Sequence, residues 1–288
     1  MKNIKMLMKK AQDFYVQKEY DKAAKAFLEV LKKVKKDKER AIIWAELSWT
    51  FYRLKDYRRV LDAITNVFHF DEDYDNKADL FRLKGYALLA LNELDEAENA
   101  LHVSLTMDRD SPKQQTIFYE LGKLYFRKQE YKQALQAFNE VESYFLQNHK
   151  EFWLSILFYK GMVHYYTGNI EDSEATFEEL LENANDNQRK AAALFGLAFI
   201  TFDRKDYLKT INLCESITSL DSSFFDLETV GFLSAASFHY LGRDDVFEKY
   251  YYELIKNYPR GRYSGDLHAI KKKIDESRKG SAQSKTGI

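Results

Sequence analysis

The 288-residue chain contains only two prolines, 11 glycines and one cysteine. Proline and glycine break helices and mark tight turns, so their scarcity argues against a many-stranded sandwich and favours long helices. A single cysteine, Cys214, excludes an intramolecular disulfide. The chain has no apolar run of about 18 residues that could span a bilayer, and lysines interrupt residues 1–10 too early for a signal peptide. We therefore expect an all-α protein of the cytoplasm.

The charge of the chain is balanced overall but unevenly distributed. Its formal net charge is −1, so bulk charge does not indicate a nucleic-acid-binding protein. Residues 1–40 carry 13 basic and 6 acidic groups, residues 256–288 carry 9 and 3, and residues 41–255 have a net charge of −14. The terminal lysines either solvate the end helices or attract an acidic partner. The acidic middle would repel phosphates and disfavours a nucleic-acid partner.

A polar turn recurs along the whole chain. Its third residue falls at positions 20, 57, 94, 131, 170, 207 and 244, with spacings of 37, 37, 37, 39, 37 and 37. After six of these turns a small or modest side chain stands four residues before a larger apolar one: Ala23/Phe27, Val60/Ile64, Ala97/Leu101, Ala134/Phe138, Ser173/Phe177 and Thr210/Cys214. The small member of such a pair lets a neighbouring helix approach, and the large member fills the gap. The period predicts seven helix-turn-helix units.

The units resemble the tetratricopeptide repeat (TPR) family. The resemblance covers about residues 4–260 and rests on Trp44-Leu47-Ser48-Phe51, on Leu121-Gly122-Tyr125-Ala134-Phe138 and on Pro259. It implies an all-α fold, an α-solenoid (right-handed superhelix) of seven TPR-like repeats starting near residues 4, 41, 78, 115, 154, 191 and 228. The units have 37 residues where the family usually has 34. We expect the extra residues in connectors such as 70–76 and 107–112.

The C-terminal residues depart from the repeat pattern. Leu267, Ile270 and Ile274 fall on one face of a predicted helix, with lysines opposite. Such a helix covers the open end of a repeat stack. We therefore expect a superhelix over residues 1–263, a capping helix over 264–279 and a flexible tail over 280–288.

The sequence offers no motif for chemistry. Residues 71–75 imitate the start of a calcium loop, but Asn76 and Arg82 replace the required Gly and Glu. The six histidines include no pair three or four residues apart, and Cys214 lies at a core position, so metal-ligand spacing is absent. We expect no catalytic residues, no metal and no cofactor, and we interpret the protein as a non-enzyme.

The resemblance implies that the first helix of each repeat lines a concave groove. The repeat register places aromatic and basic side chains there, and we predict contacts to a partner from Trp49, Tyr52, Arg53, Arg82, Tyr86, Tyr119, Lys123, Arg127, Tyr159, Met162, Tyr166 and Phe199. Aromatic rings give large, rigid contact areas, and basic groups bind carboxylates. The alternative is that these rings pack against the next repeat, which stays open for Phe195 and Phe202.

Some TPR proteins bind the C-terminal carboxylate of chaperones through a Lys/Asn clamp. The matching positions here are Met8, Gln12, Glu46, Asp79 and Leu83, so the clamp is missing. We predict a non-catalytic scaffold that binds a peptide or helix of a protein partner in the groove, with no membrane span. The alternative is a structural component of a larger bacterial assembly, such as a motility or secretion apparatus, that docks or self-associates through its convex or terminal faces. The Lys-, Phe- and Tyr-rich, Pro-poor composition suggests a bacterial source.

Overall fold

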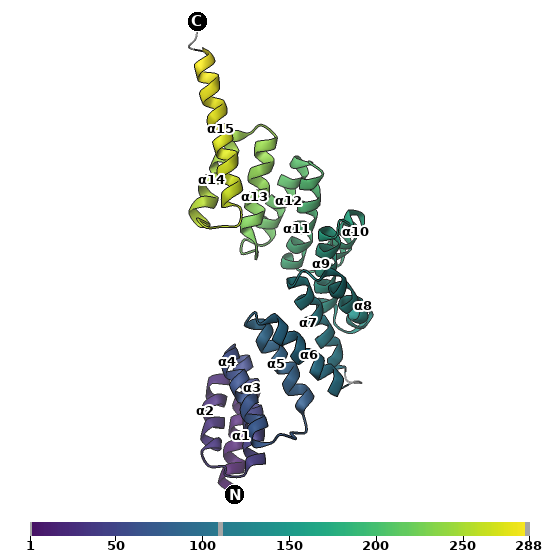
Figure 1. Ribbon diagram of the computed structural model, residues 1–288, viewed down its shortest axis with the longest axis vertical. Coiled ribbons are helices and arrows are strands. Elements are labelled where there is room, and N and C mark those ends of the chain that lie inside the picture. The colour runs from purple at the N-terminus through teal and green to yellow at the C-terminus, as the bar shows by residue number, and fades with distance from the viewer. Residues whose placement is uncertain (1, 109–111, 286–288) are drawn as a thin grey trace. The chain divides into compact units, whose positions relative to one another are not determined.

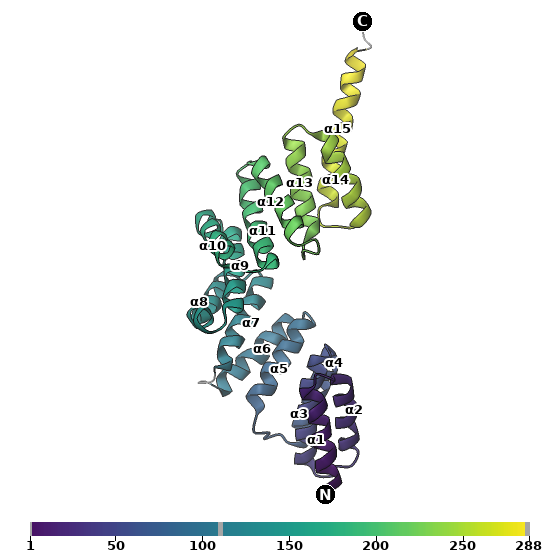
Figure 2. The ribbon, with the colours of Figure 1, turned by 180° about the vertical axis from the view of Figure 1, so that it is seen from behind.

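The computed structural model describes residues 2–108 and 112–285, which are helical apart from short connections (Figures 1 and 2). The described residues form seven antiparallel helix pairs followed by one more helix. The first helices of the pairs are α1 (Lys2–Val16), α3 (Asp37–Arg53), α5 (Lys77–Ala90), α7 (Lys113–Arg127), α9 (Lys150–Tyr166), α11 (Asn187–Asp203) and α13 (Leu227–Tyr240). The second helices are α2 (Tyr20–Leu31), α4 (Tyr57–Phe70), α6 (Leu94–Met107), α8 (Tyr131–Asn148), α10 (Ile170–Asn183), α12 (Tyr207–Leu220) and α14 (Asp244–Asn257). The predicted all-α repeat solenoid is therefore confirmed.

Every helix pair is joined by the same turn. One residue in each turn has a positive φ between 60° and 81°: Lys18, Lys55, Asn92, Gln129, Gly168, Lys205 and Gly242. In the second pair, the Lys55 amide donates to the Tyr52 carbonyl and the Asp56 amide donates to the Phe51 carbonyl. This pair of bonds, a Schellman motif, recurs at all seven turns and satisfies the last carbonyls of the first helix. The turns predicted from the sequence are thus helix C-caps.

The extra residues of the 37-residue period are only partly in connectors. Connections of six residues follow α4 and α12, as predicted for the segment after residue 70. In contrast, α3, α9 and α11 each have 17 residues and begin four residues before the predicted repeat starts at 41, 154 and 191. At α11 the Asp186 side chain accepts a hydrogen bond from the Arg189 amide, and this cap fixes the early start.

The chain divides into two compact units, residues 1–141 and 142–288, with the boundary inside α8. Each unit has a core made where first and second helices meet. Phe27, Phe138 and Phe177, the large members of three predicted pairs, have no exposed surface, and their small partners Ala23, Ala134 and Ser173 are equally buried. The predicted helix faces are therefore confirmed.

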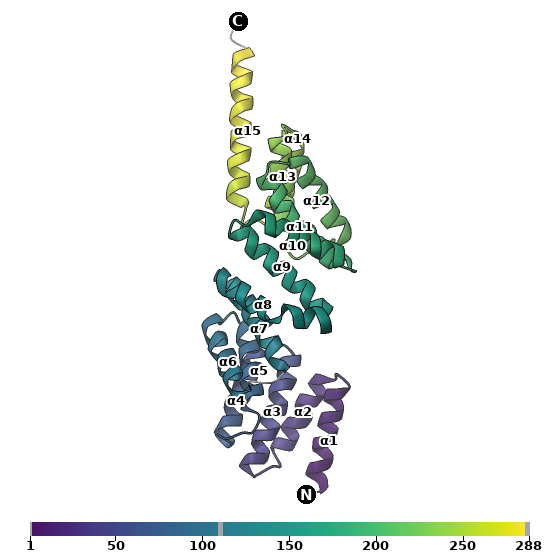
Figure 3. The ribbon, with the colours of Figure 1, turned by 90° about the vertical axis from the view of Figure 1, so that its right-hand side faces the viewer.

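Unit 2 ends in α15 (Ser264–Lys285), which packs on α14 and continues past its end (Figure 3). Leu267 and Ile274 are buried there, and Ile270 packs against the same cluster. The predicted end of this helix at residue 279 is wrong, because residues 280–285 of the predicted tail are helical. One glycine inside a helix costs only about 1 kcal/mol, and no proline stops the helix. Residues 286–288 of the predicted tail lie outside the described residues.

Candidate functional site

The first helices of unit 1 bring several predicted groove residues together. Helices α3, α5 and α7 pack side by side (Figure 1). Together they surround a surface pocket of about 230 Å³. Its walls are Tyr52, Tyr86, Leu89, Ala90, Glu120, Lys123, Leu124 and Arg127, of which four were predicted as partner contacts. We call these eight residues the unit 1 pocket.

The unit 1 pocket combines phenol rings with an ion pair. The Tyr52 and Tyr86 ring centroids lie 6.4 Å apart. The pKa of each phenol is raised, chiefly because burial disfavours its charged form, so both are neutral at pH 7. The Lys123 ammonium donates to the Glu120 carboxylate at 2.9 and 3.1 Å. The pocket therefore offers aromatic surface beside polar groups of both signs.

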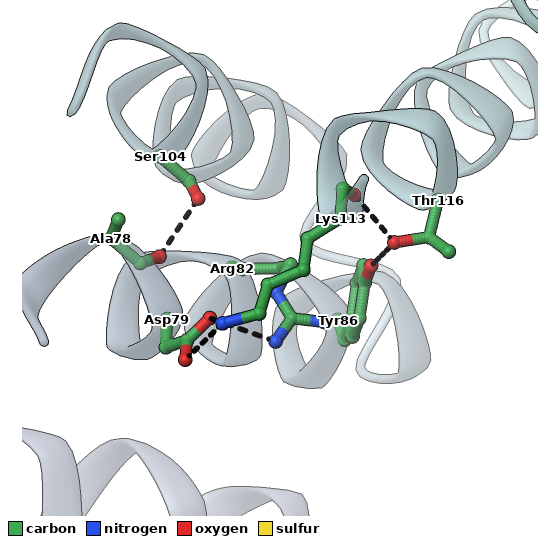
Figure 4. A network of polar contacts seen from close by, with 7 residues as sticks. All are labelled: Ala78, Asp79, Arg82, Tyr86, Ser104, Lys113 and Thr116. Carbon is green, nitrogen blue, oxygen red and sulfur yellow. Dashed lines mark hydrogen bonds and ion pairs between the residues drawn. The ribbon is translucent and has the colours of Figure 1, made fainter. Parts of the chain in front are cut away.

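A polar network supports one wall of this pocket (Figure 4). Asp79 accepts hydrogen bonds from Arg82 at 2.9 Å and from Lys113 at 2.7 and 2.8 Å. Burial alone would raise the pKa of Asp79, but the bonds from Lys113 and Arg82 outweigh it, and the pKa is lowered. The Tyr86 hydroxyl lies 3.0 Å from the Thr116 hydroxyl. These contacts join α5 to α7 and fix the orientation of Tyr86.

Two further predicted groove residues lie in or beside this network. The Arg82 guanidinium lies 5.5 Å from the Trp49 ring centroid and 5.8 Å from that of Tyr86. Its side chain is 15% exposed, and its Nε atom is buried without a hydrogen-bond partner. Arg82 thus contacts Asp79 and two rings, and these contacts help to fix the aromatic wall. Trp49 is half-buried beside it.

Arg53 and Arg127 instead join adjacent repeats at the edge of this face. The Arg53 Nε atom donates to the Tyr20 hydroxyl at 3.0 Å across the first two repeats. Arg127 donates to the Leu89 carbonyl at 3.0 Å and to the Asn92 side chain across the third and fourth. Both side chains keep exposed surface, so a partner can still reach them.

Two of the predicted contact residues are buried. Tyr119 is 7% exposed because its ring packs on Phe138 of the second helix of its own repeat. Met162 is 5% exposed and lies on α9, which contacts both α10 and α11. The structure therefore corrects the prediction at Tyr119 and Met162, which belong to the core.

The remaining three predicted residues lie in unit 2. Tyr166 is 49% exposed and contacts Tyr165, whose ring centroid lies 5.4 Å from that of Phe199. The Tyr165 hydroxyl donates to Asp203 at 2.6 Å. The pKa of Tyr165 is raised, mainly because the phenol is buried and secondly because of this hydrogen bond. Phe195 is 3% exposed and belongs to the core, whereas Phe202 is half-buried. Tyr166 and Phe199 thus border one aromatic cluster.

Tyr159 lies in a different pocket of unit 2, with a volume of about 330 Å³. This pocket is lined by Leu154, Ser155, Phe158, Tyr159, Leu180, Gln188, Arg189, Ala192 and Phe225. The contribution of Phe225 was missed by sequence reasoning, because it lies in a connector outside the first helices. Its ring centroid lies 6.1 Å from Phe158 and 5.6 Å from Phe195, which places it across two earlier repeats. An apolar pair in a polar connector, Phe224-Phe225, was the available signal.

The described part of the chain has few side chains that could act in catalysis or bind a metal ion. Cys214 is buried, as predicted, and burial raises the pKa of its thiol to about 11. Among residues 2–108 and 112–285, no group of three His, Cys, Asp or Glu side chains could hold a metal ion. Within the same residues, no helix has the length and apolarity needed to cross a membrane.

Comparison with known proteins identifies the family. A tetratricopeptide repeat family model matches residues 8–59, 82–144 and 160–209, more than half of the chain. The chain therefore belongs to the tetratricopeptide repeat family, as its sequence resemblance implied. Repeats of this family generally mediate protein–protein interaction.

One curated relative is a TPR repeat-containing protein of Methanocaldococcus jannaschii, 24% identical over 234 residues. The match covers 80% of this chain and 35% of that protein, so the chain spans about a third of the length of its relative. That relative is archaeal and gives no support to the bacterial source expected from composition.

Two solved structures illustrate the shared fold. The apo form of the quorum sensor NprR from B. thuringiensis has a TM-score of 0.73 at 11% identity, covering 93% of this chain and 80% of that one. PilW, a widely conserved type IV pilus biogenesis factor, has a TM-score of 0.60 at 17% identity, covering 80% and 97%. At these identities the likeness shows the fold alone.

Proposed function

We propose that the first-helix face of unit 1 binds a peptide or helix of a protein partner, without catalysis. The observation that carries the proposal is the unit 1 pocket, where three consecutive repeats each contribute side chains to one concavity. Its volume of about 230 Å³ suits one or two partner side chains. A surface fixed by packing and hydrogen bonds costs little ordering when a partner binds.

The chemistry of the pocket favours an apolar or aromatic anchor with a nearby carboxylate. Tyr52 and Tyr86 supply ring surface for the anchor, and their hydroxyls supply polar ends. Lys123 and Arg127 stand on the next first helix and can turn toward an acidic group of the partner. Glu120 keeps Lys123 paired in the free protein, so a partner carboxylate must compete with it. Recognition therefore rests mainly on the rings.

Unit 2 supplies candidate contacts of the same kind. Tyr166 and Phe199 border one aromatic cluster, and Tyr159 lines a separate pocket. We propose that these residues contact the same partner or another segment of it. Each unit then contributes its own first-helix face to recognition.

The test is affinity capture of partners from cells of the source organism, followed by binding titrations with the recovered partner. Tyr52→Ala should weaken binding by about 30-fold or more, as expected for an interface anchor. Lys123→Glu should have a smaller effect that fades at high salt, because exposed charges are screened over about 8–10 Å. Matched controls on the second helix α8 are the half-buried Tyr144→Ala and the exposed Lys132→Glu, and circular dichroism melts check folding.

The second candidate function is a structural component of a larger assembly. It rests on exposed apolar side chains of second helices in unit 2: Leu146, Leu208 and Tyr252 are 50%, 65% and 63% exposed. If the protein is such a component, the substitutions Leu208→Ser and Tyr252→Ala should abolish assembly. The Tyr52→Ala variant should then bind every recovered partner as tightly as the unchanged protein does. That result would replace the groove proposal.

A further inference from the structure

A second pocket lies at the first two repeats, away from the unit 1 pocket. It has a volume of about 230 Å³ and is formed by α1, the end of α2, the following connection and α3. Six of its eight lining residues are apolar: Ile4, Met8, Val30, Val34, Ile42 and Ile43. Ile42 is 46% exposed although it stands beside buried Ile43. We call these six residues the N-terminal groove.

Basic residues are frequent beside this groove in the sequence. Lys5 and Glu39 complete its wall, and Glu39 is paired with Lys36 at 3.4 Å. Residues 32–40 hold six basic and two acidic groups, and Val34 of the groove lies in the middle of them. Lys33, Lys35 and Lys38 are exposed and form no ion pair within the residues that the structure describes. The connection that carries Val34 therefore has an excess of four positive charges over residues 32–40, which favours an acidic partner.

Backbone contacts of Val34 and the side chain of Arg40 fix the shape of the groove. The Arg40 guanidinium donates to the Val34 carbonyl at 3.3 Å and lies 4.5 Å from the Phe70 ring centroid at the end of α4. The Val34 amide donates to the Val30 carbonyl at 3.2 Å. These bonds tie the lysine-rich connection to α2, α3 and α4, so the apolar wall and the charges keep one arrangement.

We propose that the N-terminal groove docks an acidic amphipathic helix of a protein partner. One apolar side chain of the helix enters the groove, and the Asp or Glu residues beside it on the helix face Lys33, Lys35 and Lys38. This is helix-in-groove recognition with charge complementarity. A concave apolar wall fits a protruding side chain, whereas insertion into a membrane requires apolar side chains that project from the protein. The site is separate from the unit 1 pocket and does not depend on it.

The test uses the full chain and a fluorescein-labelled synthetic helix with leucines at i, i+3, i+4 and i+7 and glutamates elsewhere. Fluorescence anisotropy measures its binding. Two comparison peptides have scrambled leucines, or lysines in place of the glutamates. The protein variants are Ile42→Ser and the triple Lys33→Glu/Lys35→Glu/Lys38→Glu. The matched control, Lys209→Glu/Lys249→Glu/Lys256→Glu, makes the same charge change in unit 2.

We expect the acidic amphipathic peptide to bind, and both groove variants to weaken binding about tenfold or more. The control triple and Tyr52→Ala should bind as the unchanged chain does, which separates this proposal from the proposed function. Equal binding of the scrambled peptide, or unchanged binding by both groove variants, would overturn the proposal. Capture by phosphatidylserine-containing vesicles through the same lysines, without peptide binding, would assign the surface to a membrane instead.

Discussion

Gly122 stands where the first and second helices of the fourth repeat cross, and it should not tolerate a side chain. A Cβ atom at this position would lie 2.5 Å from Cε1, 2.7 Å from Cδ1 and 2.8 Å from Cζ of Phe138. Ordinary contact begins at 3.4 Å, so the ring would have to move by about 0.9 Å. Phe138 is fully buried and packs against Tyr119, so no open space receives it.

Overpacking of this kind costs about 1–3 kcal/mol, while replacing a helical glycine returns up to about 1 kcal/mol of helix propensity. We therefore expect Gly122→Ala to lose about 1 kcal/mol of unfolding free energy and Gly122→Leu about 2 kcal/mol. Urea denaturation followed by circular dichroism measures the loss as a lower midpoint at constant slope. Gly265→Ala is the control, because no atom lies within 4 Å of its added Cβ.

An unchanged midpoint for Gly122→Leu would refute the packing argument. It would mean that the two helices do not approach closely at this residue. The register that assigns first-helix faces, and with it the unit 1 pocket, would then be wrong. A lowered slope together with the lowered midpoint would instead indicate that one unit unfolds before the other, and each unit would need its own measurement.

Three further predictions test the turns, the network and the last helix. Gly168→Ala should lower the unfolding free energy by about 1 kcal/mol in the same urea assay, because a Cβ atom is strained at the φ of 81°. No neighbouring atom crowds this position, so the backbone conformation alone is tested. An unchanged midpoint would argue against the positive φ at this turn. Asp79→Asn should cost about 1–2 kcal/mol at pH 7. The folded pKa of Asp79 lies below its unfolded value. Its contribution to stability is therefore complete above the unfolded pKa and is lost as the pH falls through the folded pKa. A difference in unfolding free energy between the original protein and Asp79→Asn that stayed constant down to pH 3 would contradict this. Deleting residues 264–288 should expose Phe247 and Leu254 and promote aggregation measured by light scattering, whereas deleting residues 286–288 should leave solubility unchanged.

The repeat pattern was readable from the sequence because its constraints are local. A turn with one positive φ needs a polar residue or glycine, and a crossing needs a small side chain opposite a large one, as at Ala134 and Phe138. Both requirements recur every 37 residues, so seven weak signals reinforce each other. Helix starts were less predictable: at α3 the start depends on Lys36 being extended, which no residue type dictates.

The candidate site was predictable only in part, because repeat register decides which face a residue takes but not what covers it. Tyr52, Tyr86, Lys123 and Arg127 meet at one pocket since three first helices stack there.

Met162 has the register position of the half-buried Tyr86 and Lys123, yet it is only 5% exposed. The repeat pattern does not contain this difference, because it depends on the side chains that surround each position. Phe225 shows the converse case, because a connector residue reaches a first-helix pocket that a repeat pattern does not include.

These two departures bear on where the proposed partner would make contact. A repeat face built from half-buried rings is rigid, since each ring is held by the next repeat, and rigid rings give binding energy at low entropic cost. The same contacts limit how much of each ring a partner can touch. In unit 1 this limit is smaller at the pocket, because Tyr52 and Tyr86 border a concavity as well as each other. In unit 2 Tyr166 is 49% exposed and offers ring surface of the same kind. Partner contact should therefore concentrate at these places and not spread evenly along the first helices.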